Sequence, residues 1–100
     1  MIPYFFHPEA IAELEEASAF YESRVAGLGQ SFAAEVQRTV TLIRQFPDTG
    51  FPVGPSRQRV LVPRFPYSVV YKRNQESIVI LAISHQRRRP RLLAAALIAR

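Results

Sequence analysis

The residues best suited to chemistry in this sequence are a histidine and four arginines that follow its last long apolar run. They stand between Ser84 and Arg91 and are His85, Arg87, Arg88, Arg89 and Arg91. An arginine side chain presents a planar fork of donors to phosphates and carboxylates, and it stays protonated at physiological pH. Imidazole titrates near neutral pH and can transfer protons. The segment therefore predicts a surface that binds phosphate or carboxylate groups.

His85 has two interpretations. In a phosphoryl-transfer site it would move the proton while Arg64 and Arg87 stabilise the charged phosphorane, and cleavage of RNA through its 2′-hydroxyl would need no metal. Alternatively, His85 caps the end of a strand and hydrogen-bonds a neighbouring backbone group, which is favoured because no second acid–base residue stands beside it in the sequence. No metal or cofactor is expected, since the chain has no cysteine and His7 and His85 lack ligand-like spacing.

Further basic residues surround a short alternating stretch, namely Arg57, Arg59 and Arg64. They would line a binding face, with Arg59 as part of a reactive site if RNA is cut, or they would protect an exposed edge strand by their charge. Tyr67 and Tyr71 follow with the same parity, so their side chains lie on one face of a strand. Such rings could stack on bases, although packing beneath helices is the favoured interpretation.

The positive charge is unevenly distributed along the chain. The net charge is +5, but residues 1–50 hold three arginines against seven acidic residues, and residues 51–100 hold ten basic residues against one acidic residue. This asymmetry indicates an anionic partner for one face, with an ordinary solvated surface as the alternative.

Length and composition limit the range of functions. The chain has 100 residues, 48% of them hydrophobic and 21% charged, which predicts one folded domain over residues 1–100. A domain of this size has little room for a deep enclosed pocket. We therefore expect its function to lie on an exposed face that binds macromolecular partners. No apolar run is as long as a membrane span, which needs about 20 residues. The first residues do not resemble a signal peptide. We therefore expect a cytoplasmic protein that makes no membrane contact.

The first half of the chain predicts one strand and two helices. Residues 2–6 are aromatic and apolar, as in a buried strand. Apolar residues recur at helical spacing over residues 8–26 and 30–45, and the glycines around residue 28 end the first helix. His7 is expected near the first N-cap. The buried positions are expected to be Ile11, Leu14, Ala17, Tyr21 and Val25 in the first helix and Phe32, Val36, Val40 and Ile43 in the second, with Glu13, Glu15, Glu16 and Glu22 on the other faces of the first.

The second half predicts a sheet. Residues 46–55 are rich in proline and glycine and are expected to form a loop without regular structure. Strands are expected over residues 57–62, 65–72 and 77–84, the last covered on both faces. The predicted fold class is α+β: an N-terminal strand, an antiparallel two-helix hairpin packed on one face, and a three-stranded antiparallel meander that completes a twisted sheet. The apolar tail, with Leu92 and Leu93, would fold back on the core or dock on a partner.

Several short motifs stand in a recognisable order along the chain. They are His7-Pro8-Glu9-Ala10, Glu13-Leu14, Phe20-Tyr21, Gly27-Leu28-Gly29 with Phe32 and Glu35-Val36, Phe46-Pro47, Arg64-Phe65-Pro66-Tyr67 with Val69-Val70-Tyr71, and Ile83-Ser84-His85-Gln86-Arg87-Arg88-Arg89-Pro90. No single motif is specific. In this order and spacing, over nearly the whole chain, the sequence resembles the RelE/ParE superfamily of type II toxin–antitoxin toxins, and the ParE-like branch most closely.

The resemblance implies a growth-inhibiting toxin of the kind associated with plasmid stabilization. Its partner would be an acidic, partly disordered antitoxin encoded beside it, whose C-terminal segment wraps the toxin in a hetero-oligomer. RelE-like members enter the ribosome and cut mRNA, whereas ParE-like members inhibit DNA gyrase. The implied target-binding residues are Arg59, Arg64, Arg87, Arg88, Arg89 and Arg91, and the implied antitoxin contacts are Leu14, Tyr21, Arg57, Arg59, Leu92 and Leu93.

Two departures from the RelE-like nucleases favour a toxin that acts on gyrase by binding. Those nucleases usually carry a tyrosine near the C-terminus and a lysine-rich sheet, whereas here no tyrosine follows Tyr71 and the only lysine is Lys72. In addition, Arg91-Leu92-Leu93 replaces the glycine–aromatic pair that many relatives carry after the proline, so the C-terminal tail departs from the family pattern. A ribosome-dependent mRNA endonuclease that uses His85, Arg64 and Arg87 is the main alternative. A family member that is no longer toxic and only binds a partner is the third.

Overall fold

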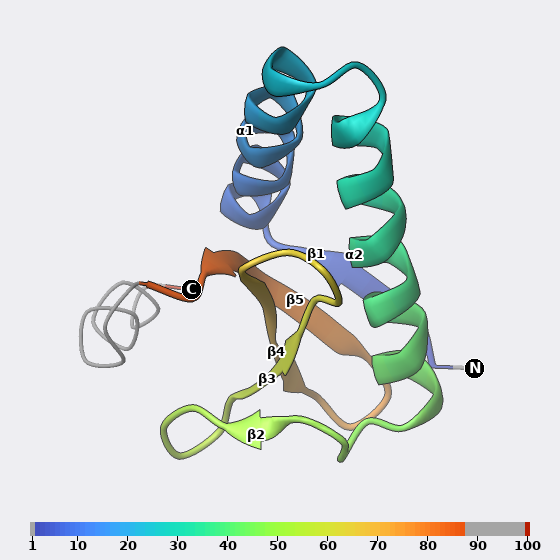
Figure 1. The fold of residues 1–100 in the computed structure, drawn as a ribbon. Helices are drawn as coiled ribbons and strands as arrows, with labels where there is room; N and C mark the ends of the chain where they lie inside the picture. Colours follow the sequence, from blue (N-terminus) through green and yellow to red (C-terminus); the bar gives the residue numbers. More distant parts are fainter. Residues whose placement is uncertain (1, 88–99) are drawn as a thin grey trace.

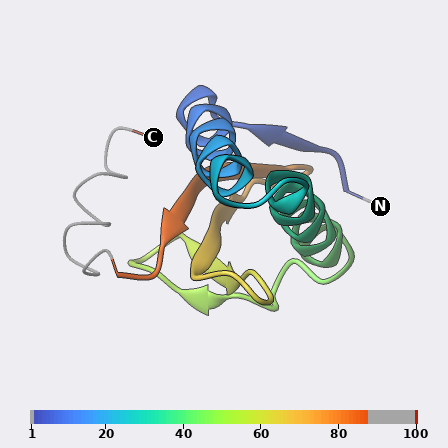
Figure 2. The same ribbon diagram turned by 45° about the horizontal axis from the view of Figure 1, so that its top comes forward.

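The computed structural model describes residues 2–87 and Arg100, and in this part of the chain two helices pack on one face of a five-stranded sheet (Figures 1 and 2). The helices are α1 (Pro8–Arg24) and α2 (Leu28–Gln45). The strands are β1 (Tyr4–Phe6), β2 (Phe51–Pro52), β3 (Gln58–Leu61), β4 (Tyr67–Arg73) and β5 (Ile78–His85), in the sheet order β1-β5-β4-β3-β2. β1 is parallel to β5, and the other neighbouring pairs are antiparallel. The predicted α+β class is confirmed.

Side chains fix both ends of the first helix. His7 is the N-cap of α1 as predicted, and its Nδ1 accepts a hydrogen bond from the backbone N–H of Glu9 at 3.1 Å. At the other end, the Glu22 carboxylate accepts hydrogen bonds from the backbone N–H groups of Gly27 at 2.7 Å and Gly29 at 3.0 Å. Gly27 has a φ of 86°, a left-handed conformation that glycine adopts without a steric penalty. The two helices are therefore joined by a short, defined turn.

The predicted apolar stripe is right for α2 and partly wrong for α1. All four expected residues of α2 are buried. In α1 the stripe starts one residue earlier, at Ala10, and Ile11 and Val25 are 43% and 58% exposed. Val25 lies outside the helix in an extended conformation, so it leaves the helical face. Ala10 and Ala17 are small, so the helix can approach the sheet closely at these positions. The larger Ile11 fits the apolar spacing better in the sequence, which is why the pattern favoured it over Ala10.

The strand tyrosines pack beneath the helices, as favoured from the sequence. Tyr71 is fully buried, donates its hydroxyl hydrogen to the Pro47 carbonyl at 2.8 Å, and accepts from the Gly50 N–H at 3.1 Å. Burial raises the pKa of Tyr71. Tyr67 packs against the rings of α1 and α2. Tyr71 is therefore not available to stack on a base.

The expectation of an irregular loop over residues 46–55 is wrong at one point. Phe51 and Pro52 form β2, which pairs with Arg59 and Gln58 of β3. A proline is tolerated here because β2 is an edge strand, where the missing N–H leaves no gap in the ladder. The proline and glycine content of the segment concealed this short strand.

β5 lies between two strands, as expected for a central strand, but only over part of its length. Val70, Leu81 and Ala82 form a second buried cluster on the face away from the helices. β1 pairs with Ile78–Ile80 alone. In the described part of the chain, the rest of β5 therefore has β4 on one side and an edge without a strand on the other.

Candidate functional site

Three of the predicted site residues lie at one end of the sheet. The turn between β3 and β4 carries Arg64, and this turn is joined to the end of β5 by a hydrogen bond from the Gln86 N–H to the Pro66 carbonyl at 2.8 Å. His85 pairs in register with Tyr67 at the start of β4, and Arg87 follows it. The structure therefore brings the β3–β4 turn and the end of β5 together at the same end of the sheet (Figure 1).

His85 makes the backbone contact that the second interpretation expected. Its Nδ1 accepts a hydrogen bond from the Arg87 N–H at 3.0 Å. Its ring stands edge-on to Tyr67, with centroids 5.1 Å apart and the planes at 75°. With Nδ1 acting as an acceptor, the proton of the neutral ring lies on Nε2. The imidazole thus fixes the direction in which the chain leaves β5.

Arg64 combines an unusual backbone conformation with an ion pair to a carboxylate of α2. Its φ is 69°, a left-handed value that costs a non-glycine residue energy. Its guanidinium pairs with Glu35 Oε1 at 3.3 Å, and the same carboxylate pairs with Arg38. The Glu35 side chain is only 11% exposed, whereas that of Arg64 is 67% exposed. One nearly buried carboxylate therefore holds two solvent-facing guanidinium groups, which we call the Glu35 cluster (Glu35, Arg38 and Arg64).

Arg59 is directed to the other face of the sheet. It pairs in register with Val70, which belongs to the cluster away from the helices, and with Phe51 of the edge strand. Leu61 shares this face and is exposed. Arg57 precedes β3, and its carbonyl accepts a hydrogen bond from Val53. The predicted target-binding arginines therefore do not form one surface, because Arg59 and Arg64 belong to different faces.

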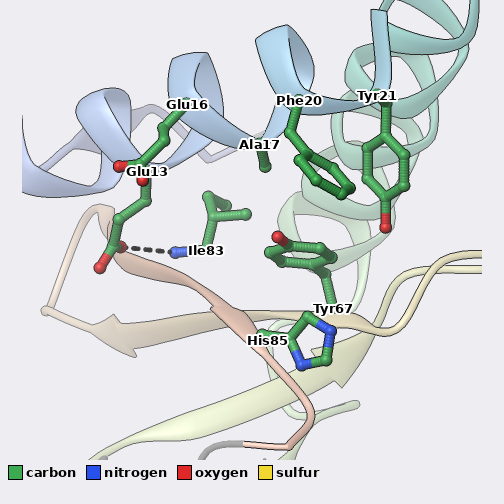
Figure 3. Close-up of a pocket in the computed structure, with 8 residues that line it drawn as sticks. All are labelled: Glu13, Glu16, Ala17, Phe20, Tyr21, Tyr67, Ile83 and His85. Atoms are coloured by element: carbon green, nitrogen blue, oxygen red, sulfur yellow. Dashed lines mark hydrogen bonds between the residues drawn. The ribbon is translucent and has the colours of Figure 1, made fainter. Parts of the chain in front are cut away.

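An open groove of about 360 Å³ lies between α1 and the end of β5 (Figure 3). The carboxylates of Glu13 and Glu16 project from α1 on one side of it, and aromatic rings stand on the other. The lining residues are Glu13, Glu16, Ala17, Phe20, Tyr21, Tyr67, Ile83 and His85. The groove is acidic and aromatic, in contrast to the basic surface that the sequence emphasised.

The phenols of this groove remain protonated at neutral pH. Burial raises the pKa of Tyr67, and the neighbouring charges of Tyr21 and Glu16 raise it further. Burial also raises the pKa of Tyr21. Both hydroxyls are therefore hydrogen-bond donors there, and neither is suited to act as a general base beside His85.

Glu13 is tied to β5 and to Arg100, contrary to its expected place on a solvated face. Its Oε1 accepts a hydrogen bond from the Ile83 N–H at 3.0 Å (Figure 3). The Arg100 guanidinium donates to both oxygens of Glu13 at 3.0 and 3.1 Å, to Glu9 at 2.8 Å and to the Leu81 carbonyl at 2.9 Å. Hydrogen bonding to Glu13 raises the pKa of Arg100.

The sequence held a signal for this cluster. Glu9 and Glu13 are four residues apart on one helix, and like charges at that spacing destabilise a helix unless a cation lies near them. We call Glu9, Glu13 and Arg100 the Glu13 cluster.

The comparison with family models identifies the family of this chain. The model of the family described as "ParE toxin of type II toxin-antitoxin system, parDE" matches residues 4–90. This chain belongs to the ParE toxin family. The fold comparison found nine matching chains of solved structures. One, described as the chromosomal ParDE TA system from P. aeruginosa, superimposes with a TM-score of 0.73 at 19% identity, over 85% of this chain and 96% of that one. The comparison with curated proteins gave no match.

The remaining predicted residues of this ParE-family chain fall into two groups. Leu14 is half-buried against the core, and Tyr21 stands among the rings of Phe32, Phe65 and Tyr67 with one edge toward the groove. Arg88, Arg89, Arg91, Leu92 and Leu93 lie outside the described residues. Between residues 2 and 87, no helix is long and apolar enough to cross a membrane.

Proposed function

We propose that this ParE-family chain acts in the cytoplasm as a toxin that inhibits DNA gyrase by binding it, and that an acidic antitoxin covers it. The observation that favours binding over RNA cleavage is the hydrogen bonding of His85. Its Nδ1 holds the Arg87 N–H, and the nearest phenol, Tyr67, has a raised pKa. Neither group is poised to take a proton from a 2′-hydroxyl.

The Glu35 cluster and Arg87 supply the surface for an anionic target. The side chains of Arg38 and Arg64 are 68% and 67% exposed, and each guanidinium is anchored at one point by Glu35. Anchoring lowers the conformational entropy that an arginine loses on binding, so it favours association. Arg87 is exposed at the same end of the sheet as Arg64. These groups suit carboxylates on a protein target or the phosphates of its bound DNA.

Supercoiling by purified gyrase tests the proposal directly. Wild-type chain at saturating concentration should block supercoiling, and Arg64→Gln should weaken the block. Arg73→Gln is the matched control, because Arg73 is an exposed arginine paired with Asp48 at the opposite end of β4. Unimpaired supercoiling at saturating wild-type chain would count decisively against gyrase as the target.

Ribosome-dependent cleavage of mRNA is the second candidate, because His85 does line a groove that also contains Tyr67 and Glu16. Mapping of mRNA ends after induction would show cuts at the ribosomal A site if this activity exists. A His85→Ala variant that cuts as well as wild type would remove His85 from the catalytic role.

Growth of cells decides whether the chain is toxic at all. Expression alone should arrest growth, and co-expression of the neighbouring gene should restore it if that gene encodes the antitoxin. Normal growth without the neighbouring gene would instead support a family member that only binds a partner.

A further inference from the structure

We infer that the Glu13 cluster is a receptor site for an arginine side chain of the antitoxin, and that Arg100 holds this site in the free chain. The inference rests on the proposed function for the identity of the partner. The site itself is argued from the contacts of Glu13, Arg100 and β5.

The open edge of β5 leaves backbone groups that side chains satisfy, and it places a carboxylate beside a carbonyl that needs a donor. β1 stops at Phe6, so beyond Ile80 the edge of β5 is served by side chains: Glu13 accepts from the Ile83 N–H, and Arg100 donates to the Leu81 carbonyl. Unpaired backbone groups at a sheet edge are points at which another chain can attach. An arginine here therefore satisfies a strand edge and a carboxylate together.

The geometry selects guanidinium over ammonium. Arg100 reaches both oxygens of Glu13, Glu9 Oε2 and the Leu81 carbonyl with four hydrogen bonds between 2.8 and 3.1 Å. Only the planar fork of arginine can serve a carboxylate with two parallel bonds and still donate to other acceptors. A lysine has a single nitrogen and could not reproduce this set.

The cluster also keeps an excess of negative charge. Within the described residues, one guanidinium faces the two carboxylates of Glu9 and Glu13, and Glu16 lies farther along the same groove. The surrounding protein has a net charge of +5, so this is an acidic site on a basic molecule. It attracts a cationic residue from a partner that is acidic elsewhere.

The Glu13 cluster is open enough to solvent for an incoming arginine to replace Arg100. Arg100 is 9% exposed, but Glu9 is 64% exposed and Glu13 is 21% exposed, so the site opens to solvent on the Glu9 side. The Arg100–Glu9 ion pair therefore lies on the solvent side of the cluster, where an ion pair contributes little to holding Arg100 in place. The groove beside the cluster offers Phe20, Tyr21 and Tyr67 as an apolar wall for the segment that carries the incoming arginine. A partner segment therefore gains contacts there in addition to the four bonds.

A titration with ethylguanidinium tests the site without any partner. The Ile83 amide resonance in a nitrogen–proton NMR spectrum reports on the site, because this N–H bonds to Glu13. In Arg100→Gln we expect a saturable shift at millimolar ethylguanidinium, and in wild type the midpoint should rise about tenfold if Arg100 holds the site about 90% of the time.

Matched variants show whether the ethylguanidinium shift depends on the Glu13 carboxylate. In the Arg100→Gln background, Glu13→Gln retains an oxygen for the Ile83 N–H but removes the charge, so the saturable shift should vanish. Glu15→Gln alters an exposed acid of α1 outside the groove and should change nothing. The site assignment is overturned if Glu13→Gln still binds, if Arg100→Gln gives no saturable shift, or if ethylammonium binds equally well.

The antitoxin measurement tests the occupant. Arg100→Gln should bind the purified product of the neighbouring gene more tightly, by up to about tenfold, because the internal competitor is gone. Glu13→Gln should bind it more weakly. Weaker binding of Arg100→Gln would show that Arg100 is only a structural anchor and would overturn the exchange. If the neighbouring product does not bind wild type, the proposed partner is wrong, and the ethylguanidinium titration still decides the site.

Discussion

Two ion-pair clusters in the described part of this chain combine arginine with glutamate in opposite proportions. In the Glu35 cluster, one nearly buried carboxylate of α2 holds two exposed guanidinium groups. In the Glu13 cluster, two carboxylates of α1 hold one guanidinium that is itself nearly buried. The first leaves positive charge at the surface and the second leaves negative charge. A domain of 100 residues thus presents a positively charged and a negatively charged cluster, one from each helix.

The clusters also differ in what they hold in place. Glu35 joins α2 to a turn whose Arg64 has a left-handed backbone, so it stabilises a loop. Glu13 joins α1 to the backbone of β5, so it stabilises a strand edge. Loss of an acceptor for a buried backbone N–H costs more than loss of an exposed ion pair. The Glu13 cluster should therefore matter more for stability, and the Glu35 cluster more for target binding.

The largest expected effect is that of Glu13→Ala. It leaves the Ile83 N–H without its acceptor and Arg100 without its main partner, so the free energy of unfolding should fall by about 2 kcal/mol. Glu13→Gln should lose less, because the amide oxygen still accepts. Urea denaturation measures both, with Glu15→Ala as the control. A loss for Glu13→Ala no larger than that for Glu15→Ala would contradict the structural role of the cluster.

The second effect isolates the backbone conformation of Arg64. Arg64→Ala and Arg64→Gly both remove the ion pair with Glu35, but only glycine accepts a φ of 69° without strain. Arg64→Gly should therefore be more stable than Arg64→Ala by about 1 kcal/mol. Both variants should inhibit gyrase less than wild type. Equal stability of the two variants would show that the turn relaxes to another conformation.

How well the sequence predicts a feature of this fold depends on how far apart in the sequence the contacting residues are. The α2 stripe and the buried face of β4 follow from local periodicity, and both are confirmed. In α1 the predicted stripe is right at Leu14, Ala17 and Tyr21 and wrong at its two ends, Ile11 and Val25, and it omits Ala10, which is too small to stand out in an apolar pattern. The contact of Glu13 with Ile83 joins residues 70 positions apart, which no local pattern reveals. The like-charged pair of Glu9 and Glu13 was a readable signal, but it does not identify Arg100 as the cation.

A smaller effect concerns alkaline pH and the groove beside the Glu13 cluster. Tyr67 and Tyr21 have raised pKa values in the folded chain, chiefly through burial. Folding therefore favours their protonated forms. This stability is fully present below the ordinary tyrosine pKa of 10.0 and is lost as the pH rises toward the folded values. Denaturation curves from roughly pH 8 to pH 11 should show the loss, and Tyr67→Phe should reduce it. An unchanged pH dependence in Tyr67→Phe would assign the loss to Tyr21 and Tyr71, whose pKa values burial also raises.

The smallest effect on stability is expected from Arg38→Gln. Arg38 is exposed and shares Glu35 with Arg64, so its removal leaves the carboxylate paired and should cost only about 0.3 kcal/mol. Gyrase inhibition should nevertheless weaken, and its dependence on salt should become less steep, because one guanidinium of the anion-binding surface is gone. Inhibition curves at several salt concentrations measure this separation of stability from binding. If Arg38→Gln inhibits like wild type at every salt concentration, the target contact lies with Arg64 and Arg87, and Arg38 serves only to hold the carboxylate that positions Arg64.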